Sequence, residues 1–387
     1  MAAKPAKELL KQHMPPVNPQ DQGESTPNHD ALLALLLEHR FPSAWAQSLR
    51  WDRAGIAKML PREDAPDLFG YDPREKRILF NSRIANGLKQ DSQGWIAFRS
   101  TSEHERAAQL LNDLADLDRP FLADMRDNRA GKGLVLPNGR AVPVFQFNRR
   151  RGSVGGILWP LGGHYQTVGS PTYFGTAFRD ELPFDAKRDD VFWRGGATGH
   201  DAQGRHGVRS LRDHAAGTLS HSACAERLKT IPRFALLDRF QNAPGFDLGF
   251  VQPPGQPSVA AFGYKLCRKM TRADMTRSRY QLAIGGNDYA SNLPWLLHSN
   301  CLVLSQELDC LVCFCGALTA WEHYVPLAND LSDLPEKLAW ARAHPDRCKT
   351  IVAQANAIAE RLASKSLEHR VRSAVLHRYR QVVQPNL

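Results

Sequence analysis

The pattern of apolar and polar positions predicts helices alternating with short buried strands through the first half of the chain. Ala31 to Leu37 and residues 105–117 carry apolar side chains at helical spacing. The apolar runs VPVFQF at 142–147 and GGILWPL at 155–161 have the length and composition of buried strands. This alternation predicts an α/β domain.

The stretch YQLAIGGNDYASNLPWLLHSNCLVLSQ predicts a compact strand, helix, strand unit in the second half. Apolar runs at 280–284 and 301–304 form the two buried strands, with a Gly-Gly-Asn-Asp turn after the first. Ser291 suits the N-cap of a helix that begins at Asn292. A helix N-terminus directly after a glycine turn can bind a phosphate. On periodicity alone, an ordinary crossover without a ligand is the favoured interpretation.

A second glycine-rich turn follows a predicted strand at 191–193. The chain continues as RGGATG, and Gly195 and Gly196 let the backbone approach an anion because no Cβ stands in the way. Guanidinium groups that match phosphate oxygens follow nearby. They belong to Arg194, Arg205, Arg209 and Arg212. The spacing matches neither common nucleotide-binding glycine motif, and a glycine hairpin beside solvated arginines explains it nearly as well.

The last part of the chain predicts one more short strand at 323–327 and two amphipathic helices. Their apolar stripes run from Cys348 to Leu362 and from Leu367 to Tyr379. We expect these helices to pack back across a domain boundary.

The length of 387 residues exceeds what one hydrophobic core normally holds, so two domains are expected. We place a loose tail at 1–29, an N-terminal α/β domain at 30–186, a C-terminal Rossmann-like domain at 187–345 and the final helices at 346–387. The boundary falls in the charged stretch FDAKRDD.

The charge balance favours an anionic partner. Lys and Arg outnumber Asp and Glu by 50 to 40, a net charge of +10, which suits a nucleotide, a phosphorylated glycan, nucleic acid or acidic lipid. Basic and aromatic residues also interleave between Trp51 and Arg77, where they predict either a glycan or nucleic-acid groove or a solvated face with aromatic side chains turned inward.

The cysteines predict a reducing compartment. The chain has seven, an odd and clustered set that makes a poor disulfide framework. Cys310, Cys313 and Cys315 have a spacing that allows metal binding, but burial of small residues is the favoured interpretation. No run reaches the ~20 apolar residues of a membrane span, and the first residues lack the apolar segment of a secretory signal. We therefore expect a cytoplasmic protein that is soluble or contacts an anionic membrane peripherally.

Four blocks of the sequence resemble glycosyltransferase family 90, the CAP10-like family of protein O-glucosyltransferases, capsule xylosyltransferases and lipopolysaccharide-modifying enzymes. The blocks are VPVFQFN (142–148), VFWRGGATG (191–199), GGNDYASNLPWLLHSNCLVL (285–304) and HYVPLANDLSDL (323–334). The resemblance implies a GT-B fold, in which two Rossmann-like domains face a cleft. It also implies inverting transfer from a uridine diphosphate sugar, and the third block is similar to the bacterial lipopolysaccharide branch.

The resemblance implies a donor site in the C-terminal half. Its candidate residues are Arg194, Gly195, Gly196, Thr198, Arg205, Arg209, Asn287, Asp288, Ser291 and Asn292. Arginines and amides would stabilise the leaving diphosphate, while Asn287 and Asp288 would hold sugar hydroxyls or shape the turn. Eukaryotic members place an arginine shortly after the Ala-Ser pair. This chain has Asn292, Leu293 and Pro294 there, so that charge must come from elsewhere.

The resemblance also implies an aspartate base upstream of the first block. Asp127 in MRDNR occupies that place, Asp124 is the second candidate and His164 the third. Arg126 and Arg129 would hold Asp127 ionised, although a plain surface ion pair explains the same residues.

No cofactor or metal is expected, because arginines can take the place of a cation and no clear D-x-D step precedes the donor site. The partners expected are a nucleotide sugar and a glycan or lipid-linked glycan, rather than nucleic acid. The alternatives are a non-catalytic protein that binds anionic glycan or nucleic acid, a protein O-glycosyltransferase, and transfer of another sugar such as xylose or mannose.

Overall fold

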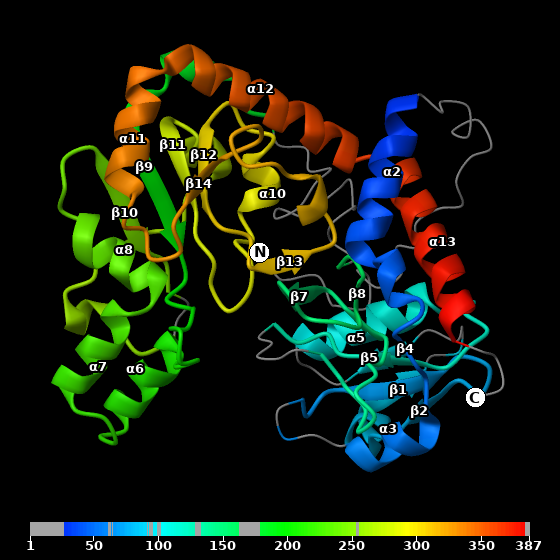
Figure 1. Ribbon diagram of the computed structural model, residues 1–387. Coiled ribbons are helices and arrows are strands. Elements are labelled where there is room, and N and C mark those ends of the chain that lie inside the picture. Colours follow the sequence, from blue (N-terminus) through cyan, green and yellow to red (C-terminus); the bar gives the residue numbers. More distant parts are fainter. Residues whose placement is uncertain are drawn as a thin grey trace.

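The protein has two lobes, each built on a five-stranded sheet (Figure 1). The computed structural model describes residues 27–60, 63, 65–90, 92, 96–98, 102–127, 133–161, 179–252 and 255–383. Most of the predicted tail lies outside the described residues. The first described helix, α2, begins inside that tail, at Pro27.

The N-terminal lobe contains a mixed sheet with the strand order β2-β1-β5-β6-β8. Its strands are β1 (Phe69–Asp72), β2 (Arg77–Leu79), β5 (Phe121–Ala123), β6 (Val144–Gln146) and β8 (Gly156–Leu158). The hairpin β1–β2 and the pair β1–β5 are antiparallel, whereas β5, β6 and β8 run parallel. The helices and short elements of this half are α2 (Pro27–Arg40), η2 (Ser43–Trp45), α3 (Arg53–Met59), α4 (Ser82–Gly87), the hairpin β3 (Leu88–Gln90) and β4 (Ile96–Phe98), and α5 (Ser102–Asp113).

The C-terminal lobe contains an all-parallel sheet with the order β10-β9-β11-β12-β14. Its strands are β9 (Arg188–Gly195), β10 (Phe246–Phe250), β11 (Ser278–Ala283), β12 (Leu302–Gln306) and β14 (Val325–Leu327). The connecting elements are η4 (Phe184–Ala186), α6 (Gly207–Ala215), α7 (His221–Lys229), α8 (Pro232–Phe240), η5 (Val259–Phe262), α9 (Arg272–Met275), α10 (Leu293–Leu296), η6 (Cys315–Ala317) and α11 (Leu334–Ala343). All five residues of β12 are buried, as expected for a parallel strand covered on both faces.

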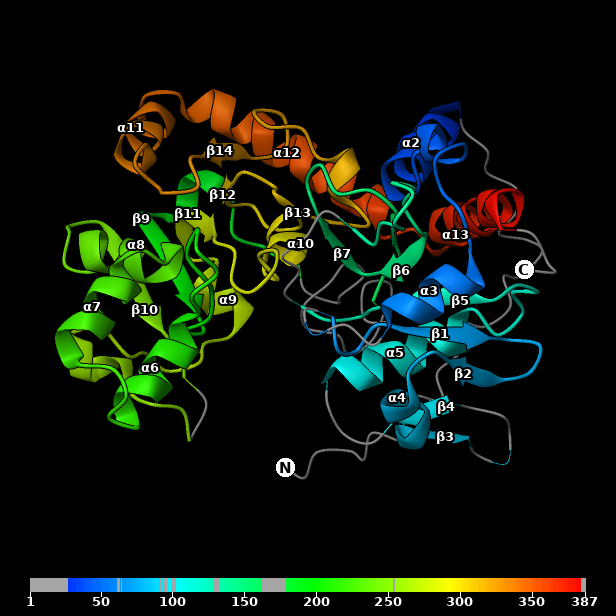
Figure 2. The same cartoon turned by 60° about the horizontal axis from the view of Figure 1, so that its bottom comes forward.

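Three features join the lobes. Strand β7 (Asn148–Arg150) pairs antiparallel with β13 (Cys310–Val312), which comes from the other half of the sequence. Helix α12 (Pro345–Leu362) crosses from one lobe to the other (Figure 1 and Figure 2). Its first turns bury Cys348 and Ile351 in the C-terminal core, and its last turns bury Ile358 and Leu362 in the N-terminal core. Helix α13 (Lys365–Val382) then lies beside α2.

The predicted strand, helix, strand unit is confirmed, but its helix start is not where we expected it. Strands β11 and β12 pair in parallel, and the single turn α10 connects them. Ser291 is exposed and is not the N-cap. Asn292 is the residue before α10, and its side chain makes no capping bond because its amide donates 2.9 Å to the carbonyl of Leu282 on β11. The prediction that Ser291 caps this helix was therefore wrong.

The basic and aromatic segment forms a solvated face. Trp51, Phe69 and Tyr71 are buried in the N-terminal core. The basic side chains between them are exposed at Arg53, Lys58, Arg74, Lys76 and Arg77; Arg62 lies outside the described residues. All seven cysteines are free thiols, and Cys310, Cys313 and Cys315 are buried, as the sequence predicted.

Candidate functional site

The candidate site lies at the carboxyl ends of the parallel strands in the C-terminal lobe. The chain passes from β9 to β10 on one side of β9 and then returns to β11 on the other side. Ligands of open α/β sheets bind at such a switch point, outside the carboxyl ends of the two strands where the order reverses. A cavity of about 160 Å³ opens there. Its walls are Arg150, His200, Pro232, Ala283, Gly285, Gly286, Asp288, Tyr289, Ala290, Ser305, Gln306, Glu307, Leu308, Asp309, Cys310 and Asn329.

Two glycine turns, one after β9 and one after β11, form one side of the site by packing against each other. The amide of Gly199 donates 3.2 Å to Oδ1 of Asn287, so the two turns are directly bonded. Gly199 has φ +121°, which favours glycine. A Cβ on Gly286 would lie 2.8 Å from both Oγ1 of Thr198 and Nη2 of Arg233. Glycine is therefore required at both positions for the turns to approach this closely.

Arg233, which the sequence analysis missed, donates hydrogen bonds to both glycine turns. From the start of α8 its guanidinium donates to the carbonyls of Gly196, Ile284 and Gly285 and to Oγ1 of Thr198, at 2.7–3.3 Å. Burial lowers its pKa to about 10, while the carboxylate of Asp288 acts in the opposite direction. The residue therefore remains charged at neutral pH and supports the turns. No spacing or motif in α8 indicates this role.

Asp288 is a half-buried carboxyl group that lines the cavity. Burial and the negative charge of Asp127 raise its pKa to about 7, against the opposing effects of Arg106 and Arg233. The electrostatic effect of Asp127 means that a carboxylate of the N-terminal lobe lies close to the cavity of the C-terminal lobe. The structure thus brings Asp127 and Asp288 into one site.

Asp127 lies just after β5, in a different setting from the one we predicted. Its partner is Arg106 of α5, which donates to Oδ1. Arg126 instead forms a bidentate pair with the buried Asp124, with both bonds at 3.1 Å. Nδ2 of Asn148 donates 2.8 Å to the backbone carbonyl of Asp127 and so fixes the chain there. Arg129 and His164 lie outside the described residues.

Two of the predicted phosphate-binding arginines are engaged within the protein. Nη2 of Arg194 donates 2.5 Å to Asp247 of β10, and the guanidinium also lies over the ring of Phe192. Nε of Arg205 donates 2.6 Å to Asp201 within its own turn. Neither residue lines the cavity. Arg209 is exposed in the first turn of α6 and pairs with no carboxylate among the residues that the structure describes.

The predicted glycine Gly195 is needed for packing rather than for ligand access. A Cβ there would lie 2.4 Å from the ring of Trp193. Gly196 has open space where a Cβ would lie, and its carbonyl accepts a bond from Arg233.

Part of the candidate site, including Asp288 and the turn at 285–286, lies in a segment that resembles a known family. Residues 259–385 match the family model described as Glycosyl transferase family 90. The chain is also 25% identical over 212 residues to the O-glucosyltransferase LpsA of Dichelobacter nodosus, and the match covers 54% of each protein. The chain is thus similar to members of glycosyltransferase family 90.

Shorter matches relate this chain to protein O-glucosyltransferases. It is 35% identical over 89 residues to protein O-glucosyltransferase 3 of Homo sapiens, covering 23% of this chain and 18% of that protein. It is 34% identical over 86 residues to protein O-glucosyltransferase 2 of Danio rerio, covering 22% and 17%. The chain spans about half the length, or less, of the curated relatives it matches.

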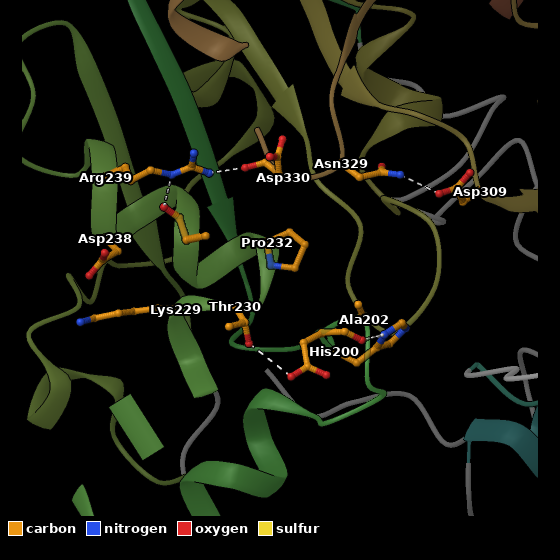
Figure 3. Close-up of a pocket in the computed structure, with 12 residues that line it drawn as sticks. His200, Ala202, Lys229, Thr230, Pro232, Asp238, Arg239, Asp309, Asn329 and Asp330 are labelled. Atoms are coloured by element: carbon orange, nitrogen blue, oxygen red, sulfur yellow. Dashed lines mark hydrogen bonds between the residues drawn. The ribbon is translucent and has the colours of Figure 1, made fainter. Parts of the chain in front are cut away.

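A second and larger cavity, about 630 Å³, adjoins the first. The two share His200, Pro232, Asp309 and Asn329. Figure 3 shows how the labelled side chains surround the second cavity. Nδ2 of Asn329 donates 2.6 Å to Oδ2 of Asp309, and Oγ1 of Thr230 donates 3.2 Å to Oδ2 of Asp201. Four aspartates lie along its wall: Asp201, Asp238, Asp309 and Asp330. Such a wall suits hydroxyl groups better than phosphates.

Within the described ranges no group of three His, Cys, Asp or Glu residues is arranged to hold a metal ion. Cys310, Cys313 and Cys315 are buried as free thiols.

Asp288 gives the stability of the protein a predictable pH dependence. The pKa of Asp288 is higher in the folded state than in the unfolded chain, so its contribution to stability is complete below about pH 4 and is lost as the pH rises through about 7. Between pH 5 and pH 8 this amounts to about 2–3 kcal/mol of unfolding free energy, at ~1.4 kcal/mol per pH unit. We expect urea denaturation of Asp288→Asn to lack this loss.

Asp127→Asn is the matched control for that measurement. It removes the charge of Asp127 but not the burial of Asp288, so the pKa of Asp288 stays raised by a smaller amount. We therefore expect the unfolding free energy to fall with pH by less than in the wild type, but still to fall. A fall of equal size in the wild type and in Asp288→Asn would show that Asp288 does not titrate in this range.

Proposed function

We propose that the protein is an inverting glycosyltransferase that moves a sugar from a uridine diphosphate sugar to a hydroxyl group of a glycan acceptor. In this proposal the two lobes are the Rossmann-like domains of a GT-B enzyme, with the donor held mainly by the C-terminal lobe. One observation carries it: the carboxylate of Asp127 comes from the N-terminal lobe, yet its charge acts on Asp288 in the cavity of the C-terminal lobe. A base and a donor pocket thus meet at one place.

Asp127 is the proposed base. In an inverting transfer the acceptor hydroxyl loses its proton to the base while its oxygen forms a bond to the anomeric carbon. The bond between that carbon and the diphosphate oxygen breaks on the opposite face, and the electron pair leaves with the diphosphate. Arg106 and the bond from Asn148 to the backbone of Asp127 fix the position of the carboxylate. Fixed geometry of this kind is what proton transfer requires.

The donor would occupy the two adjoining cavities. The diphosphate and sugar fit the smaller one, where the glycine turn at 285–286 allows close backbone approach. The nucleoside fits the larger one, because its aspartates can accept bonds from ribose hydroxyls and would repel phosphates. Asp288 and Asn287 would bind or position the donor sugar.

The printed names of the relatives suggest the sugar and one acceptor class, and the sequence suggests another. The relative with the longest overlap among those compared is called an O-glucosyltransferase LpsA, which favours glucose as the sugar. The resemblance of residues 285–304 to the lipopolysaccharide branch favours a lipopolysaccharide acceptor. The human and zebrafish relatives are called protein O-glucosyltransferases, so a protein hydroxyl is the second candidate acceptor. Among the described residues no helix is long and apolar enough to cross a bilayer. Contact with a lipid-linked acceptor would then use the basic surface that the charge of +10 predicts.

Thermal denaturation with a panel of nucleotides and nucleotide sugars tests the donor site. At about 100 times its dissociation constant, uridine diphosphate glucose should stabilise the protein by ~2.7 kcal/mol, a rise in melting temperature of about 3 °C for a chain of this length. Guanosine and adenosine diphosphate sugars are the controls and should give smaller shifts. A flat response to every nucleotide would instead favour the non-catalytic glycan or nucleic-acid binder.

We also propose that no divalent cation is required. The thermal denaturation is repeated with a chelator, and sugar transfer is measured with and without manganese. Equal shifts and equal rates are expected in both conditions, because arginine side chains can neutralise the diphosphate. Loss of turnover on chelation that manganese restores would contradict this proposal.

A further inference from the structure

A leaving diphosphate needs positive charge beside it, and the smaller cavity has few side chains that can supply it. Arg150 is the one guanidinium group among the described residues that line this cavity. The other arginines near the two glycine turns bind backbone or carboxylate groups of the protein. Arg233 donates to three backbone carbonyls, and Arg194 and Arg205 are paired with aspartates.

Arg150 belongs to the N-terminal half of the chain, whereas most of the cavity wall comes from the C-terminal lobe. It is the last residue of β7, where it lies opposite Cys310 in the β7–β13 pair. This pairing sets the backbone of a residue from the N-terminal half beside the carboxyl end of β12. The side chain is therefore delivered to the cavity by a strand and not by a free loop.

The guanidinium of Arg150 is held at the cavity by His200. Nη2 of Arg150 lies 2.8 Å from Nε2 of His200, which follows the glycine turn after β9. Nδ1 of His200 lies 3.1 Å from the carbonyl of Asp201. A carbonyl only accepts, so Nδ1 carries the hydrogen and Nε2 accepts the bond from Arg150. The contact therefore joins the two lobes at the shared edge of both cavities.

We propose that Arg150 is a donor-binding residue that supplies positive charge to the diphosphate from the N-terminal lobe, and that His200 positions its guanidinium. This rests on the proposed function, because it assigns a ligand to the same cavity. A guanidinium has five N–H groups in one plane, so it can donate to several acceptors at once. The same group can thus stay on His200 and donate to phosphate oxygens, which matches the bidentate geometry arginine forms with phosphate.

Lys229 and Arg239 of the larger cavity are less suited to this role. Nζ of Lys229 lies 3.1 Å from the carboxylate of Glu226. Arg239 donates to the carbonyls of Ala235 and Asp330 (Figure 3). Both stand on the wall that carries the aspartates, away from the glycine turns.

The test compares ligands that differ only in phosphate. Binding of uridine, uridine monophosphate and uridine diphosphate is measured by calorimetry for the wild type, Arg150→Gln and Arg150→Lys. We expect Arg150→Gln to weaken uridine diphosphate binding by about 10- to 100-fold and to leave uridine within about twofold. Arg150→Lys should recover part of the loss, because it restores the charge but not the planar fork.

Arg151→Ala is the matched control. It removes the same charge from the next residue, whose side chain is largely exposed, lies 3.8 Å from Asp309 and does not line the cavity. We expect its affinity for uridine diphosphate to stay within about threefold of the wild type, as for a surface arginine. Arg150→Ala is the second truncation, used if Arg150→Gln is poorly folded.

The outcomes separate this inference from the proposed function. If the wild type binds uridine diphosphate and Arg150→Gln binds it equally well, Arg150 is not a phosphate ligand and the proposed function stands. An equal loss for uridine and uridine diphosphate would make Arg150 a structural link between lobes and would also overturn the inference. If the wild type binds no uridine nucleotide, the proposed function fails and this inference fails with it.

Discussion

Replacement of Asp127 with asparagine should lower kcat by about 10²- to 10⁴-fold, the usual contribution of a general base. Asparagine keeps the size of the side chain but cannot accept the acceptor proton. Asp127 comes from the lobe opposite the donor cavity, so affinity for uridine diphosphate should stay within about threefold of the wild type. The measurement pairs initial rates of sugar transfer with calorimetric titration of the nucleotide.

Asp124→Asn and Asp118→Asn are the comparison variants for this prediction. Asp124 is buried and forms a bidentate pair with Arg126, so its replacement should lower stability more than the rate. Asp118 is half exposed in the same lobe and should change neither quantity measurably. If Asp127→Asn keeps more than about a tenth of the wild-type rate, Asp127 is not the base, given what such a base contributes.

Replacement of Glu368 with glutamine should lower the free energy of unfolding by about 3–5 kcal/mol, as expected when one partner of a buried ion pair is removed. Glu368 on α13 accepts from Nη1 and Nη2 of Arg40 at 2.9 and 2.6 Å, and from Nε of Arg372 at 2.8 Å. Burial alone would raise the pKa of Glu368, but the charges and hydrogen bonds of these two arginines outweigh it and hold the pKa below its usual value. Without the carboxylate, the fully buried guanidinium of Arg40 loses its neutralising charge.

Urea denaturation followed by circular dichroism measures this loss. Glu336→Gln is the control, because Glu336 on α11 is largely exposed and lies 3.7 Å from Lys337. Its replacement should cost no more than ~1 kcal/mol. A double replacement, Arg40→Met with Glu368→Leu, should be less destabilised than Glu368→Gln, since no uncompensated charge remains on α2. Equal stability of Glu368→Gln and Glu336→Gln would show that the buried pair contributes little.

The sequence by itself determined the elements whose signal is local. The apolar runs at 280–284 and 301–304 predicted the parallel strands β11 and β12, and the stripe from Cys348 to Leu362 predicted α12. Side-chain periodicity depends only on the residues within one strand or helix, so it can be read without knowing the partners. The glycine turns after β9 and β11 were recognised for the same reason, and the blocks at 285–304 and 323–334 lie in the segment that matches the family they resemble.

Other features of the site were decided only by the tertiary structure, because they depend on residues far apart in sequence. Ser291 had the right chemistry for a helix cap, but Asn292 instead found the carbonyl of Leu282 once β11 was in place. Arg126 pairs with Asp124, and Asp127 takes its arginine from α5.

The tertiary structure also decided which acceptor each arginine near the cavity binds. Arg194 looked like a phosphate ligand beside its glycines, yet β10 supplies Asp247 as its partner. Arg233 and Arg150 carry no motif, and they reach the site only because α8 packs beneath the turns and β7 pairs with β13. A guanidinium group binds whichever acceptor the folded chain places within reach, and burial makes an unpaired one costly. The sequence therefore identified which residue types could bind a phosphate, and the packing of the two lobes decided which of them face the cavity.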